Sequence, residues 1–137
     1  MARVTKERRE IERLLWRAGF GPRPNEAANL ARKGRRAVVE ELLRPRGRQV
    51  GGAPPRVDGQ PIDPINRWSH DTLWWFDRAV RTRQPLAERM TLNWHDHWAT
   101  SNRKVGDTKL MMAHYWVLRR HALPNAYQYK KDGKYTP

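Results

Sequence analysis

The residues best suited to chemistry are two histidines that lie two positions apart in the segment Trp94-His95-Asp96-His97-Trp98. A strand would place His95 and His97 on one face, where both imidazoles could bind the same metal ion. The surrounding segment has the spacing of a helix, which turns the two side chains roughly 200° apart. We therefore expect no metal and no other cofactor, and His95 and His97 are the candidate ligands if a metal is bound.

Acid–base catalysis has three candidate residues, which are His97, Asn93 and His114. Asn93 lies one helical turn before His97, so the two side chains can form a hydrogen bond. We favour a buried His97 with such a bond and an exposed His95 that points the opposite way, near Glu88. His114 belongs to a later helix and would meet His97 if the two helices pack together. We expect no catalysis, and a His-dependent or metal-dependent enzyme domain remains an alternative.

A third group of side chains could bind nucleic acid, because Arg67, Trp74, Arg78 and Arg81 share one face of a predicted helix. An indole beside guanidinium groups can stack on bases and neutralise phosphates. The chain has 28 Lys+Arg against 14 Asp+Glu, and its net charge of +14 attracts polyanions. Arginine-rich helical faces are also ordinary solvated surfaces. A basic nucleic-acid-binding helical module is thus a second alternative function.

Hydrophobic periodicity predicts the helices that must position these residues. Gly19, Gly21 and Gly34 mark helix ends, and Pro85 suits a first turn. The expected helices span about 5–18, 25–33, 35–43, 66–82, 85–100 and 107–122. Their apolar faces, which we expect to form the core, comprise Ile11, Leu14, Leu15 and Ala18; Val38, Val39, Leu42 and Leu43; Trp68, Thr72, Trp75, Phe76, Ala79 and Val80; Leu86, Met90, Trp94 and Trp98; and Leu110, Val117 and Leu118.

The fold class that follows is all-α, a small irregular bundle of about five to six helices with a long Pro/Gly-rich loop. The chain of 137 residues can bury one modest core, in which its seven tryptophans have a large share. We divide it into N-terminal helices (1–43), the Pro/Gly-rich loop (44–66), a Trp-rich helical part (67–123) and a tail expected to be disordered (124–137). The absence of cysteine excludes disulfides and thiolate metal sites.

The sequence also predicts where the chain resides. No apolar run is long enough to span a bilayer, and the charged segment 1–17 has no apolar region of the kind that a secretory signal needs. We expect no membrane partner and a cytoplasmic location.

Three blocks of sequence resemble a known bacterial family in order and spacing, over about Leu14 to Leu123. They are LLWRAGFGPRPNEAANLARKG, WWFDRAVRTRQPLAERMTLNWHDHWATSNRKV and LRRHAL, and the family they resemble is the domain of unknown function 1800 (DUF1800). The resemblance implies a mostly helical, uncharacterised protein, and it implies that relatives are usually several times longer and often exported. It leads us to expect an N-terminal fragment of a larger family member with a structural or interaction role. Its partner would be the missing C-terminal body or another protein.

Overall fold

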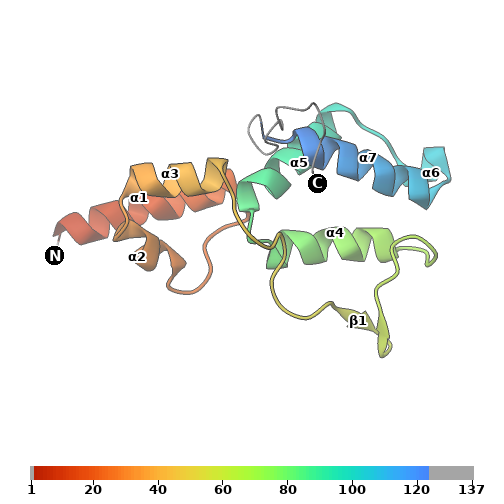
Figure 1. Cartoon of the computed structure of the whole chain (residues 1–137), viewed down its shortest axis with the longest axis horizontal. Coiled ribbons are helices and arrows are strands. Elements are labelled where there is room, and N and C mark those ends of the chain that lie inside the picture. Colours follow the sequence, from red (N-terminus) through yellow and green to blue (C-terminus); the bar gives the residue numbers. More distant parts are fainter. Residues whose placement is uncertain (1, 124–137) are drawn as a thin grey trace, which may run out of the picture.

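Helices make up most of residues 2–123, the part of the chain that the computed structural model describes (Figure 1). The all-α prediction is therefore confirmed. The expected disordered tail, 124–137, lies outside the described residues. The helices are α1 (Ala2–Ala18), α2 (Glu26–Ala31), α3 (Arg35–Leu43), α4 (His70–Arg81), α5 (Pro85–His97), α6 (Asn102–Val105) and α7 (Thr108–His121).

The first three helices enclose a small apolar core at one end of the molecule (Figure 1). Ile11 and Val38 are each only 1% exposed, and Leu15 packs with them. These three residues lie on the faces that the sequence predicts, whereas Leu43, which we also expected in the core, is 40% exposed at the end of α3. Helix α1 ends at Ala18, and Gly21 then adopts a φ of 97°, which a side chain would oppose.

The Pro/Gly-rich loop contains a short hairpin that was not expected. Strand β1 (Arg56–Val57) pairs antiparallel with β2 (Gln60–Pro61). The two residues between them, Asp58 and Gly59, both have positive φ, as a tight hairpin turn requires. The loop is also attached to α4, because Arg81 Nη1 donates hydrogen bonds to the carbonyl oxygens of Gly51 and Ala53.

The second half of the molecule consists of α4 on one side and α5 with α7 on the other (Figure 1). Its helices begin at residues suited to that position: Pro85 opens α5, and the Asp107 carboxylate accepts from the N–H groups of Lys109 and Leu110 at the start of α7. At Gly19, a Cβ would lie 2.7 Å from that of Pro85, so the end of α1 meets the start of α5 at a position where only glycine fits.

The apolar faces of α4, α5 and α7 point largely outward, contrary to our expectation. Phe76 is 67% exposed, Val80 75% and Leu110 59%. Trp68 and Trp98, which we expected on the same faces, lie just outside α4 and α5 and are also exposed. The residues buried in their place include Arg78, Glu88 and Arg119. The prediction was wrong because it assumed an apolar interior, whereas these helices turn their charged residues toward one another.

Candidate functional site

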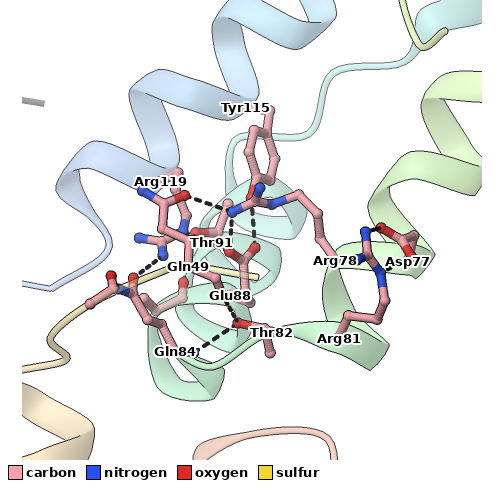
Figure 2. A network of polar contacts seen from close by, with 12 residues as sticks. Gln49, Asp77, Arg78, Arg81, Thr82, Gln84, Glu88, Thr91, Tyr115 and Arg119 are labelled. Carbon is pink, nitrogen blue, oxygen red and sulfur yellow. Dashed lines mark hydrogen bonds and ion pairs between the residues drawn. The ribbon is translucent and has the colours of Figure 1, made fainter. Parts of the chain in front are cut away.

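Glu88 is the centre of a buried network of charges that joins three helices (Figure 2). Its Oε1 accepts hydrogen bonds from Arg78 Nη2 of α4 and Arg119 Nε of α7, each at 2.8 Å. Its Oε2 accepts from the Tyr115 hydroxyl of α7 at 2.6 Å. Because Glu88 belongs to α5, this one carboxylate fixes α4 and α7 relative to α5.

Amide side chains extend the network and satisfy the remaining donors (Figure 2). Gln49 Oε1 accepts from Arg78 Nη2 at 2.8 Å, and Gln84 Oε1 accepts from Arg119 Nη2 at 2.6 Å. Two guanidinium groups thus share one carboxylate, and neutral oxygens solvate the excess positive charge. Buried charges require such partners, since an unpaired buried ion is strongly destabilising.

The environment of Glu88 keeps it ionised. Burial raises the pKa of this carboxyl, but Arg78 and Arg119 lower it more, so that it lies below its ordinary value of 4.5. Burial and the nearby Glu88 charge raise the pKa of Tyr115 above its ordinary value of 10.0. Glu88 is consequently a carboxylate whose two oxygens both accept hydrogen bonds at neutral pH. That is the arrangement of a structural ion cluster and leaves no free general base.

A cavity of about 510 Å³ opens beside this network, between α4, α5 and α7. Tyr115 joins the network and the cavity. Its hydroxyl donates a hydrogen bond to Glu88, and its ring is edge-on to Trp74, with the two ring centroids 4.9 Å apart. The volume lies in the range of known ligand pockets, and the lining is mostly apolar. Its wall consists of Phe20, Asp71, Thr72, Trp74, Trp75, Phe76, Ala79, Arg89, Leu92, His95, Thr100, Asn102, Met111, Met112 and Tyr115.

A second hollow of about 420 Å³ continues the cavity along α4 toward the turn after α1. The two hollows share Phe20, Phe76 and Ala79, and together we call them the α4 groove. Two arginines on its wall, Arg83 and Arg89, have no carboxylate partner among the described residues.

The α4 groove also has carboxylates on its wall, each of which accepts a hydrogen bond. Asp71 accepts a hydrogen bond from Asn102 Nδ2 at 3.1 Å, and Glu26 accepts from the backbone N–H of Arg23 at 2.7 Å. Both hydrogen-bond donors are neutral, so the carboxylates keep their charge, and the groove combines an apolar floor with unpaired arginines and carboxylates at separate points of its wall.

The histidine pair occupies positions opposite to those we expected. His97 and its proposed partner Asn93 are both exposed, and no hydrogen bond joins them. His95 is half-buried on the cavity wall, with its ring edge-on to Trp75 at 4.6 Å. The expectation failed because Glu88 and Thr91, not the Met90–Trp94–Trp98 stripe, set the inward face of α5, and His95 follows that face.

The structure brings His95, not His97, close to His114. The two rings lie 6.0 Å apart, and His114 Nδ1 is hydrogen-bonded to Thr100 Oγ1 at 3.0 Å. His95 Nε2 is buried without a partner in the described part of the chain, and burial together with His114 lowers the pKa of His95. Within residues 2–123 there is no cluster of three or more His, Asp or Glu residues that could hold a metal ion.

The predicted nucleic-acid face does not exist as one surface. Arg78 is only 7% exposed and stacks on the half-buried Trp74, with its guanidinium carbon 5.0 Å from the ring centroid. Arg81 is bound by Asp77 and by the loop carbonyls, whereas Arg67 is exposed. Stacking between Trp74 and an arginine is present, but it occurs inside the helical packing. The expectation of a shared solvated face is therefore wrong.

Sequence reasoning missed the members of the network: Gln49, Gln84, Glu88, Tyr115 and Arg119. One signal was present in α5, where Gln84, Glu88, Thr91 and His95 recur at helical spacing and form a polar stripe. A polar stripe reads as a solvated face unless its partners on other helices are known.

These features define a class of protein, an all-helical protein with a buried ion cluster beside an apolar groove. The chain belongs to the family described as protein of unknown function (DUF1800), whose family model matches residues 13–129. Neither the curated proteins nor the solved structures contain a match to it. No helix in residues 2–123 is both long enough and apolar enough to cross a membrane.

Proposed function

We propose that this chain is a helical interaction module that binds an acidic, amphipathic segment of another protein in the α4 groove, without catalysis of its own. The observation that carries the proposal is the exposure of apolar side chains on α4 beside the unpaired arginines of the same groove. Phe76 is 67% and Val80 75% exposed, and both line it. Contiguous exposed apolar surface rimmed by polar residues is typical of binding sites.

The shape of the α4 groove favours a polypeptide. Its two hollows follow one helix, and a partner helix presents apolar side chains at matching intervals of three and four residues. Charge favours an acidic partner, because a second copy of this chain would bring another +14 against the first. Acidic residues in the partner would instead pair with Arg83 and Arg89 at the wall of the groove.

The absence of catalysis is supported by the state of the ionisable groups. Glu88 and Tyr115 are engaged with each other and with arginines, and His97 stands exposed without Asn93. Nucleic acid is a less suitable ligand than a polypeptide, because Arg78 is buried and Arg81 is held by Asp77.

Selection from a displayed library of random peptides tests the proposal. We expect the selected peptides to carry an apolar stripe with Asp or Glu beside it, and to lose binding to Phe76→Asp and Val80→Asp variants. Leu43→Asp is the matched control, since Leu43 is 40% exposed on α3, outside the groove. Circular dichroism must show that all three variants stay helical. Selected peptides that bind both α4 variants as well as the parent would contradict the proposal.

Two other occupants of the α4 groove would give different results. Self-association that light scattering detects, and that Phe76→Asp abolishes, would assign the groove to a second copy. Binding to duplex DNA whose log affinity falls linearly with log salt, and in which DNA displaces the selected peptides, would assign it to nucleic acid. Either result overturns the proposal.

A further inference from the structure

We infer that the cavity between α4, α5 and α7 takes an aromatic side chain of the partner as its anchor, with a carboxylate beside it that contacts Arg89. This inference rests on the proposed function and specifies which side chain of the partner the α4 groove would bind. It predicts that the cavity also binds a free aromatic carboxylate.

The walls of the cavity suit an aromatic ring. Trp74, Trp75 and Phe76 follow one another on α4 and all line it. Trp74 and Trp75 already form edge-on contacts with the ring of Tyr115, at 4.9 and 5.6 Å. A further ring entering the cavity can adopt the same edge-to-face geometry, which aromatic pairs prefer.

Two methionines of α7, Met111 and Met112, form the opposite wall. Their unbranched side chains adapt to the outline of a ligand and make favourable sulfur–aromatic contacts. With about 510 Å³ available, the cavity has room for a bicyclic ring such as indole.

At the Phe20 end of the cavity, charge favours a carboxylate over an amine next to the ring. The guanidinium of Arg89 lies 5.9 Å from the centre of the Phe20 ring, on the cavity wall and without a carboxylate partner among the described residues. The Asp71 carboxylate accepts a hydrogen bond from the neutral Asn102 amide and keeps its charge, but it lies in the first turn of α4, away from the Phe20 end that adjoins the second hollow. Burial and the neighbouring His114 lower the pKa of His95, so this histidine is neutral at neutral pH and suits an uncharged ring.

Titration calorimetry with three related probes tests the inference: indole-3-propionate, neutral indole and cationic tryptamine. We expect indole-3-propionate to bind about two- to fivefold more tightly than indole, the range of an exposed ion pair, and tryptamine to bind most weakly. Arg89→Gln should remove the preference for indole-3-propionate over indole. Equal affinities for the three probes, or the tightest binding for tryptamine, would overturn the carboxylate part of the inference.

A filling substitution shows where the probes bind. Ala79→Leu places a larger side chain in the cavity, and we expect it to weaken all probes about tenfold or more. Ala113→Leu, the same change at an exposed position of α7 that lines neither hollow, is the matched control and should leave binding unchanged. Thermal melts check that both variants fold. Failure of indole-3-propionate to bind, or binding that Ala79→Leu does not weaken, would overturn the inference.

The failures of the two proposals can be told apart. If Ala79→Leu weakens probe binding but no selected peptide binds the groove, the aromatic site is supported and the interaction module is refuted. If the selected peptides need Phe76 but still bind the Ala79→Leu variant, the interaction module is supported and the aromatic anchor is refuted.

Discussion

The two halves of this molecule are held together by opposite means. The helices α1–α3 pack around aliphatic side chains such as Ile11, Leu15 and Val38. The helices α4, α5 and α7 surround Glu88, Arg78 and Arg119, and most of their large apolar residues are left near solvent. The first half has an aliphatic core, although Trp16 and Leu43 stay exposed, whereas the interior of the second half consists largely of charged groups.

This difference explains why the α4 groove lies where it does. A helix has a limited circumference, so a buried polar stripe turns the apolar stripe of an amphipathic helix toward the outside. In α4 the buried residues are His70 and Arg78, and the outward residues include Phe76 and Val80. The ion cluster and the exposed apolar groove are thus two sides of one arrangement.

Of the changes that test this comparison, removal of the Glu88 carboxylate should lower the stability most. We expect Glu88→Ala to lower the free energy of unfolding by about 3–5 kcal/mol, because Arg78 and Arg119 would remain buried without their counter-ion. Urea denaturation measures the loss. The control is Glu41→Ala, which removes an exposed pair with Lys33 and should cost at most about 1 kcal/mol. Equal losses in the two variants would refute a structural role for the network.

A cavity in the aliphatic core should have the next largest effect, confined to the other half. Leu15→Ala is expected to cost about 2–5 kcal/mol through lost burial and an unfilled space. Hydrogen exchange should show faster opening of α1–α3, with the amides around Glu88 affected less. The exposed Leu43→Ala is the control and should change little. Uniform acceleration of exchange in both halves would mean that the two cores do not open independently.

A change of pH should give the smallest difference in stability between the two halves. Folding lowers the pKa of Glu88, so its contribution is complete above pH 4.5 and is lost as the pH falls through the folded-state value. Folding raises the pKa of Tyr115, so its contribution is present below pH 10.0 and is lost as the pH rises through its folded-state value.

Hydrogen exchange at a series of pH values measures both changes, which we expect in α4, α5 and α7 and not in α1–α3. Tyr115→Phe should remove the alkaline change and cost about 1–3 kcal/mol at neutral pH, because Glu88 and Arg78 each lose a partner. An alkaline change that persists in Tyr115→Phe would assign it to another group.

Local signals were enough to predict most helices but not the faces they bury. Gly19 and Pro85 mark a helix end and a helix start in both sequence and structure, because caps and breakers act within one turn. The four-residue α6 and the hairpin after Pro55 were missed, because such short elements show too little periodicity.

The candidate site depended on information that no local window contains. Arg78, Glu88 and Arg119 each look like solvated residues alone, and only their meeting across three helices makes their burial favourable. We predicted the roles of His95 and His97 by assuming that the apolar residues of α5 face the core. In the structure Glu88 faces the core instead, and His95 lies on the same side of α5.

The spread of the ion cluster along the chain has a consequence for the order of folding during synthesis. The aliphatic core is complete once Leu43 has left the ribosome, and its contacts are local enough to form early. The cluster draws on Gln49, Arg78, Glu88 and finally Arg119, so it cannot close until nearly all of the described chain has emerged. Until that moment Trp74 and Trp75 lack their edge-on contacts with Tyr115, and it is then that a chaperone would be of most use.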